Sequence, residues 1–209
     1  MREPGNSVLR IIYDKIMGEQ VKRLEEARNP RVIYVTDLVS CTHRFHLRTQ
    51  YPELTLVFEP SAVLGNVAHW GVEALLREKG IDVEVEVSRT ISVDGVEYVV
   101  KGRLDAVDKA SGTVIEIKTA RSAVNLPKEH HVKQLNIYLS LTGLDRGVLV
   151  YITPDKVVEY SFSREPVDLE SEVRDLVEDR RHPRYAWECA YCIYKKLCPY
   201  YTVGEQKRS

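Results

Sequence analysis

The stretch of sequence that decides the fold is DVEVEVSRTISVDGVEYVVKGRLDAVDKASGTVIEIKT, residues 82–119. Apolar and polar residues alternate over 83–93, which is typical of a half-buried strand. The Asp-Gly pair at 94–95 is a strong hairpin-turn signal, and 96–108 reads as the returning strand. After a Ser-Gly turn, residues 113–119 read as a third strand. The stretch therefore predicts an antiparallel meander of three strands.

Helical patterns flank this meander on both sides of the sequence. The predicted helices are 7–28, one that starts at Thr36-Asp37 and carries Cys41, 61–79, 128–142 and 167–181. A short apolar run at 32–35 precedes the second helix, and two further strands are expected at 147–153 and 157–163. This order predicts an α/β or α+β domain in which helices flank a central mixed sheet.

The composition is that of a folded globular chain. Of 209 residues, 44% are hydrophobic and 29% are charged, which argues against intrinsic disorder. The formal net charge of −1 excludes a simple polycation that coats nucleic acid. No apolar run reaches the ~20 residues of a membrane-spanning helix. The first ten residues, MREPGNSVLR, lack the apolar core of a secretion signal, so we expect a cytoplasmic protein.

The four cysteines indicate a metal site. Three of them form C-x2-C-x5-C within ECAYCIYKKLCPYY, residues 188–201, and the fourth lies far upstream. These cysteines are Cys41, Cys189, Cys192 and Cys198. Close cysteines in a chain without a secretion signal more often bind metal than form disulfides. Four thiolates suit zinc or an iron–sulfur cluster. The spacing favours the cluster, because it lacks the paired C-x2-C knuckles of a zinc ribbon.

Two carboxylates and a lysine lie on the second and third strands of the meander. Asp105 ends the segment GRLD, and Glu116 and Lys118 share one face of the next strand. If these strands pair, the carboxylates lie side by side, and a hard cation such as Mg²⁺ or Mn²⁺ would relieve their repulsion. A lysine beside such a cation can assist phosphodiester hydrolysis. The bland alternative is a solvated strand face, on which Glu-x-Lys is common.

Two helices add polar side chains at suggestive places. His69 lies on the upstream helix, on a face shared with Gly65, Asn66 and Glu73, where it could supply a nitrogen ligand. Gln134 and Tyr138 are four residues apart on the downstream helix and therefore neighbours on one face. Each signal is weak alone, since a lone helix histidine usually packs or is solvated and a tyrosine can simply pack on the sheet.

The ordered set of these motifs resembles the RecB-like nucleases of the PD-(D/E)xK superfamily. More narrowly, it resembles the CRISPR-associated protein four family, which are RecB-type exonucleases with an iron–sulfur cluster. The resemblance extends from Cys41 to Cys198. It implies a restriction-endonuclease-type core at 61–166, completed by a cluster subdomain built from 1–60 and 167–209.

The resemblance also implies a role for each motif residue. His69, Asp105, Glu116 and the backbone carbonyl of Ile117 would bind Mn²⁺ or Mg²⁺, and Lys118 would be the catalytic lysine. The four cysteines would hold a cluster, [4Fe–4S] or alternatively [2Fe–2S]. Gln134 and Tyr138 would orient the site and touch DNA, whereas Arg44 and Arg48 are phosphate candidates from the residues themselves.

As an enzyme of this family, the protein would degrade single-stranded or single-strand-ended DNA, commonly 5′ to 3′, and would trim DNA for the CRISPR integrase. Two other functions fit the same residues: a DNA- or integrase-binding module with vestigial cleavage, and a RecB-like repair nuclease outside CRISPR. Cleavage polarity, the number of catalytic metals and the oligomeric state stay open. The aromatic residues of the tail could either stack on bases or shield the cluster.

Overall fold

The predicted meander is present in the computed structural model, which describes residues 7–202. Its strands are β2 (Asp82–Val93), β3 (Val96–Asp108) and β4 (Thr113–Thr119). Asp94 and Gly95 both have positive φ, 51° and 77°, as the tight turn between two long strands requires. The fold prediction of a mixed α/β domain is confirmed.

The remaining strands complete a six-stranded mixed sheet. They are β1 (Val32–Tyr34), β5 (Arg146–Ile152) and β6 (Val157–Ser163). The order is β1-β3-β4-β5-β6, with β2 paired along β3. β1 runs parallel to β3 and β4 runs parallel to β5, whereas the other pairs are antiparallel. β4, the strand with both Glu116 and Lys118, therefore lies in the middle of the sheet, where its neighbours fix its position.

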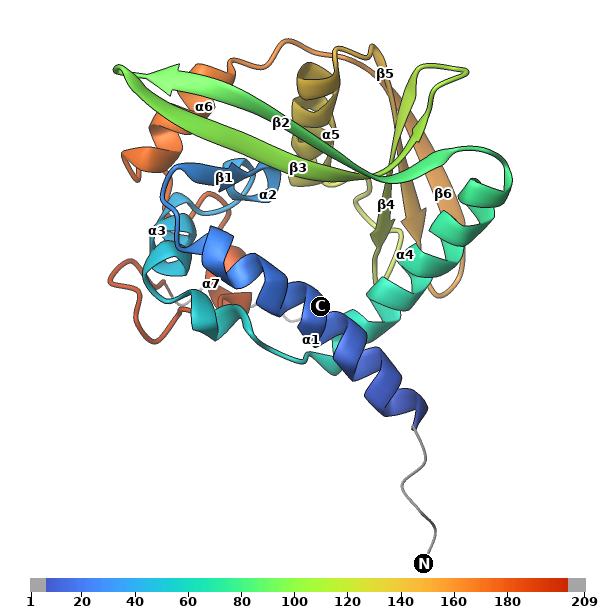
Figure 1. Ribbon diagram of the computed structural model, residues 1–209, viewed down its shortest axis with the longest axis horizontal. Helices are drawn as coiled ribbons and strands as arrows, with labels where there is room; N and C mark the ends of the chain where they lie inside the picture. Colours follow the sequence, from blue (N-terminus) through green and yellow to red (C-terminus); the bar gives the residue numbers. More distant parts are fainter. Residues whose placement is uncertain (1–6, 203–209) are drawn as a thin grey trace, which may run out of the picture.

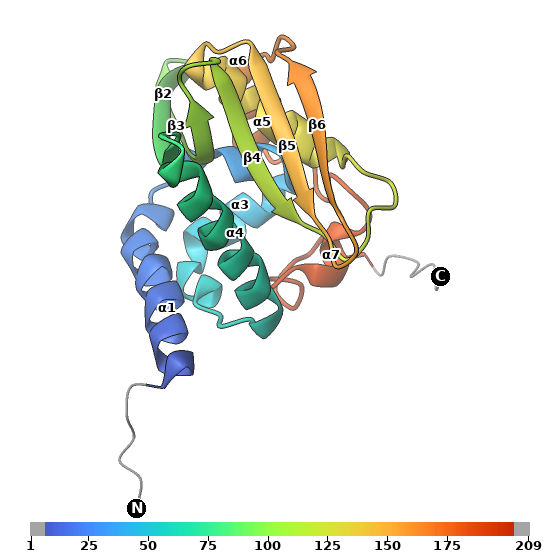
Figure 2. The same ribbon diagram turned by 90° about the vertical axis from the view of Figure 1, so that its right-hand side faces the viewer.

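Helices lie on both sides of this sheet. They are α1 (Val8–Ala27), α2 (Val35–Leu38), α3 (Thr42–Gln50), η1 (Pro52–Thr55), α4 (Pro60–Glu78), α5 (Glu129–Thr142), α6 (Leu169–Val177) and α7 (Glu188–Tyr191). Figure 1 shows the chain from blue to red, and Figure 2 shows α4 in front of the sheet and α5 behind it. Within the described residues, no helix is both long and apolar enough to cross a membrane.

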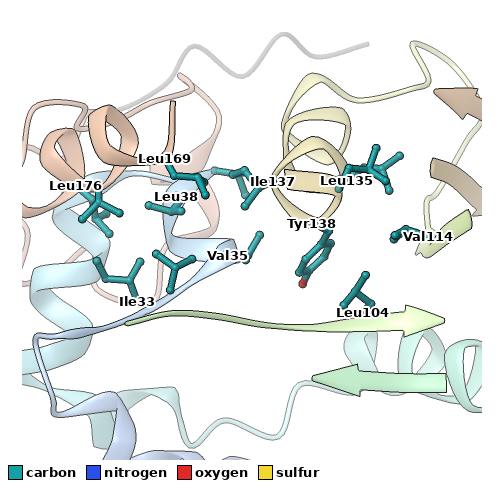
Figure 3. Packing of buried hydrophobic residues seen from close by; sticks show 14 of the residues in the cluster. Ile33, Val35, Leu38, Leu104, Val114, Leu135, Ile137, Tyr138, Leu169 and Leu176 are labelled. Atoms are coloured by element: carbon teal, nitrogen blue, oxygen red, sulfur yellow. The ribbon is translucent and has the colours of Figure 1, made fainter. Parts of the chain in front are cut away.

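The hydrophobic core lies between the sheet and the helices on one side of it, among them α5. Figure 3 shows Tyr138 of α5 with Val35 on one side of it and Val114 on the other, Leu104 below it and Leu135 above it. Leu104, Val114 and Leu135 are fully buried. Burial of such side chains stabilises the fold by about 1.5–3 kcal/mol each relative to exposure. Helix α5 is therefore anchored to the sheet by its apolar residues, which fixes the polar ones beside them.

Two predicted helices differ in the structure. The helix expected from Thr36 is divided into α2 and α3, with Cys41 between them at the N-cap of α3. The helix expected over 167–181 ends at Val177, and Asp179 has a φ of 53°. Asp179 accepts a hydrogen bond from Thr42 Oγ1 at 2.8 Å, so this early end binds the tail to the start of α3. The outer ends of the predicted cluster subdomain, 1–6 and 203–209, lie outside the described residues.

Candidate active site

A gap between two strand ladders forms the floor of the site. β3 pairs with β1 through Val99–Lys101 and with β4 through Ala106–Asp108, so residues 102–105 lie between the two ladders. The pairing of β3 with β4 ends at Ala106 and Ile115, directly beside Asp105 and Glu116. Asp105 uses this gap: its Oδ2 accepts a hydrogen bond from the backbone N–H of Ile117, at 2.7 Å. A side chain thus replaces a strand partner and connects the two carboxylate-bearing strands.

Tyr138 fills the same gap from α5. Its ring packs so closely on Gly102 that a Cβ there would lie 2.4 Å from Tyr138 Cε1. Its hydroxyl donates to the carbonyl of Arg103 at 3.2 Å. Tyr138 is buried, and burial raises the pKa of its hydroxyl, so it is a neutral hydrogen-bonding group. The Gly-Arg-Leu-Asp and Gln-x3-Tyr motifs are therefore in direct contact, through Tyr138 and the backbone of Gly102 and Arg103.

Glu116, Lys118 and Gln134 form a closed hydrogen-bonded group. Lys118 Nζ donates to Glu116 Oε1 at 2.6 Å and to Gln134 Oε1 at 3.0 Å. Gln134 Nε2 donates to the same Glu116 oxygen at 2.9 Å. The other oxygen of Glu116, Oε2, is buried without a hydrogen-bond partner. Such an orphaned acceptor is costly, and a bound cation would satisfy it.

The pKa of Glu116 also indicates a cation at this carboxyl group. Burial raises the pKa of this carboxyl to about 7, against the opposing effect of Lys118 and with a further rise from Asp105. A buried carboxyl beside a second carboxylate needs positive charge to ionise fully at neutral pH. Lys118 supplies part of that charge, and a divalent cation would supply the rest.

A second set of donor atoms comes from α4. His69 Nδ1 lies 3.3 Å from Asp105 Oδ1, and donor atoms of His69, Glu73 and Asp105 all lie within 4.8 Å of one another. Burial lowers the pKa of His69, but the hydrogen bond and charge of Asp105 outweigh it, so the pKa is raised overall. The structure therefore brings His69 to Asp105 as the sequence predicted.

Glu73 was not predicted as a site residue. It lies four residues after His69 on the same helix face, and that spacing was the available signal. The side chain is buried, and burial, followed by the charges of Glu84 and Asp105, raises its pKa. A buried carboxyl with this environment is a further potential ligand for a cation at Asp105.

These side chains line one open groove of about 930 Å³. Its wall contains His69, Asp105, Glu116, Lys118, Gln134 and Tyr138, together with residues of α1 and the basic residues Lys101 and Arg103. The donor set is oxygen-rich with one imidazole, which suits Mg²⁺ or Mn²⁺. The groove therefore has the ligands and the lysine that metal-assisted phosphodiester hydrolysis requires.

The four cysteines lie together in a neighbouring cavity. All four are free thiols, and all line one cavity of about 210 Å³. Burial raises the pKa of the Cys41 thiol to about 11 and also raises that of Cys198. Thiols with raised pKa values stay protonated at neutral pH unless a metal displaces the proton and binds the thiolate. An all-sulfur donor set around one cavity fits an iron–sulfur cluster or zinc.

The two predicted phosphate contacts differ in their surroundings. Arg44 is exposed and lines the cysteine cavity. Arg48 is buried: its guanidinium donates to Asp37 Oδ2 at 2.9 Å and to the carbonyl of Ala27 at 3.1 Å. The expectation that Arg48 contacts phosphate is wrong for this structure, because its guanidinium is buried and already bound to Asp37 and the carbonyl of Ala27.

Comparison with known proteins agrees with this geometry. The family model of the PD-(D/E)XK nuclease superfamily matches residues 76–199, and the fold and site thus define a metal-dependent nuclease that hydrolyses DNA. A relative from Saccharolobus solfataricus, the CRISPR-associated exonuclease Cas4, is 45% identical over 192 residues, which cover 85% of this chain and 94% of the relative. The chain belongs to the Cas4 family of CRISPR-associated nucleases, and the resemblance predicted from the motifs is confirmed.

Solved structures give the same result for the fold. The crystal structure of SSO0001 superposes with a TM-score of 0.87 at 39% identity and covers 94% of this chain and 98% of that one. The alkaline exonuclease LHK-Exo from Laribacter hongkongensis has a TM-score of 0.52 at 15% identity, over 75% of this chain and 89% of that one. The second likeness concerns the fold alone.

Proposed function

We propose that this nuclease is an exonuclease that degrades single-stranded DNA from an end, 5′ to 3′, and trims DNA fragments for spacer acquisition by the CRISPR integrase. The observation that carries the chemistry is the convergence of Asp105, Glu116 and Lys118 in one groove, with one buried Glu116 oxygen unpartnered. The substrate, polarity and partner rest on membership of the Cas4 family and on the resemblance of the motifs.

The ligands of the divalent metal would be His69, Asp105, Glu116 and the carbonyl of Ile117, with Glu73 as an additional donor. The cation, when bound, would polarise the scissile phosphate and acidify a water. Lys118 would hold the attacking water or offset charge on the phosphate, because its ammonium is fixed by Glu116 and Gln134. Tyr138 would position the site from behind, since its hydroxyl is directed to the protein backbone.

The four cysteines would hold a [4Fe–4S] cluster, with [2Fe–2S] as the alternative for the same thiolates. Its role would be structural, because Cys41 precedes α3 and the other three cysteines lie in the C-terminal tail. A bound cluster would thus join two segments that are distant in the sequence. Arg44, exposed beside this cavity, remains a candidate phosphate contact.

The decisive experiment is cleavage of end-labelled single-stranded DNA by anaerobically purified protein, with Mn²⁺ or with EDTA. We expect Mn²⁺-dependent shortening from the 5′ end, and loss of it in Glu116→Ala with the fold and brown colour intact. Label at each end in turn reports the polarity. Glu73→Gln should raise the Mn²⁺ concentration needed for half-maximal cleavage. A folded, brown wild-type protein that binds DNA without cutting would favour the binding-module alternative.

A further inference from the structure

Three aromatic rings from two distant parts of the chain lie together at the cysteine cavity, which shares Thr36 and Gln134 with the groove. Tyr185 and Trp187 belong to the tail before α7, and their rings stack with 5.9 Å between centroids and 12° between planes. His130 of α5 lies 5.2 Å from Trp187 and 5.7 Å from Tyr185. We call these three residues the ring cluster. Trp187 is 50% exposed, so a large apolar ring is held in place and yet open to solvent.

The ring cluster is connected to the catalytic groove along α5. His130 lies one helical turn before Gln134, which places both on one face, about 6 Å apart along the axis. Gln134 and Thr36 line both the groove and the cysteine cavity, and His130 and Trp187 line that cavity. Burial and then the charge of Lys118 lower the pKa of His130, so Lys118 lies within electrostatic reach of the ring cluster.

Positive charge accompanies the rings. Arg44 and Lys195 line the same cavity and are exposed. Rings interleaved with cations are what a single strand of nucleic acid requires, because its bases stack and its phosphates need counter-charge. The tail is fixed in this position by Glu188, whose carboxylate accepts hydrogen bonds from the backbone N–H groups of Cys41 and Tyr185, at 2.7 and 2.8 Å.

We propose that the ring cluster of His130, Tyr185 and Trp187 is a stacking site for one unpaired base of the DNA strand whose scissile phosphate lies at Lys118. This inference rests on the proposed function and assigns to the tail a role in selecting single strands. A base inside a duplex has both faces covered by its neighbours and cannot stack on Trp187. An unpaired base has a free face and gains stacking with any sequence.

The test combines protein variants with abasic substrates. Single-stranded oligonucleotides carry one abasic nucleotide, moved position by position along the strand, and kcat/KM is measured for each with the full, cluster-loaded protein. For the wild type we expect one position at which the missing base lowers kcat/KM about 5- to 150-fold, the range of base–aromatic stacking. For Trp187→Ala we expect a similar loss on intact DNA and no further loss at that abasic position.

Two further variants separate stacking from a structural role. Trp187→Phe retains a ring and should recover most of the activity and the abasic penalty. Tyr191→Ala, which removes a 77% exposed ring from the same tail, should behave as the wild type does. An abasic penalty of equal size in the wild type and Trp187→Ala would overturn the proposal. So would equal losses in Trp187→Ala and Tyr191→Ala, because the tail would then act without the ring cluster.

Binding measurements keep the two proposals distinguishable. If the wild type does not cleave DNA, the exonuclease proposal fails, and the same abasic series is read as Kd by fluorescence anisotropy without divalent metal. A single position whose base strengthens binding in the wild type, but not in Trp187→Ala, would support the ring cluster on its own. Binding that is indifferent to abasic position would overturn it.

Discussion

The carboxylate groove and the cysteine cavity both bring together residues from distant parts of the chain, but they are built differently. In the groove, Glu116 lies on a central strand between the fully buried Val114 and Ile117. Gln134 and Tyr138 lie on α5, whose buried residues continue from Gln134 to Leu139. Strand pairing and apolar packing therefore fix the positions of these polar groups. Neither of these interactions requires a bound metal or cofactor.

Around the cysteines, individual polar contacts hold the chain segments in position. Cys41 N–H donates to Glu188, Thr42 Oγ1 donates to Asp179, and Arg184 Nε donates to the carbonyl of Ser40 at 3.2 Å. The tail from 178 to 202 contains only one short helix, α7. Individual hydrogen bonds of this kind contribute ~1 kcal/mol each. The groove is therefore stabilised by its core, whereas the cysteine region has the most stability to gain from a bound cofactor.

The largest effect is expected from removing the groove lysine. Lys118→Met should lower kcat about 10²- to 10³-fold, the usual cost of losing one group that stabilises transition-state charge. The core around it should persist, with unchanged circular dichroism and a retained affinity for DNA. Lys109→Met, at an 80% exposed lysine side chain paired with Asp82 on the hairpin side, is the matched control. A Lys118→Met enzyme within tenfold of the wild type would remove the lysine from the chemistry.

Breaking the cysteine cavity should loosen only its own region. In Cys198→Ser we expect loss of bound iron and rapid tryptic cleavage at Lys195-Lys196, because the tail then depends on its few hydrogen bonds. Strand and helix content should change little, since no residue beyond α6 belongs to the main hydrophobic cluster. Tyr201→Ser, at an exposed position three residues on, serves as control. Global unfolding of Cys198→Ser would show that the two regions are not independent.

The difference between the regions also explains what could be predicted from the sequence. Strand alternation and the Asp-Gly turn carry local signals, so β3 and β4 have the predicted bounds. No local sequence signal indicated that Arg48 is buried. Its burial against Asp37 depends on where the chain turns at Cys41, which in turn depends on Glu188, 147 residues away. The sequence places Glu73 on the same helix face as His69, but only the packing of α4 on the sheet reveals that it is buried near Asp105.

A smaller effect is expected at the gap between the strand ladders. In Gly102→Ala the new Cβ would lie 2.4 Å from the Tyr138 ring, which is buried and cannot move freely. We expect a loss of about 1–3 kcal/mol in the free energy of unfolding. Gly18→Ala, in α1 with no atom within 4 Å of the added Cβ, is the control and should gain up to about 1 kcal/mol. Urea denaturation of both variants measures the difference, and equal stabilities would contradict the close contact.

The last effect concerns pH and lies between the two regions, at His131. Burial, and then the charges of Lys118 and His130, lower the pKa of this imidazole to about 3, whereas the unfolded value is about 6.5. Between these values the unfolded chain binds more protons, so stability is fully present above pH ~6.5 and is lost as the pH falls. The slope from this one group approaches about 1.4 kcal/mol per pH unit.

His131→Asn should remove that slope, which urea denaturation at several pH values between 5 and 7.5 would measure. The matched control is Tyr151→Phe, because it removes the 2.9 Å hydrogen bond to His131 Nδ1 and leaves the titrating ring in place. If the slope disappears in Tyr151→Phe as well, the hydrogen bond and not the burial of the imidazole controls the titration. If it persists in His131→Asn, groups other than His131 set the acid sensitivity.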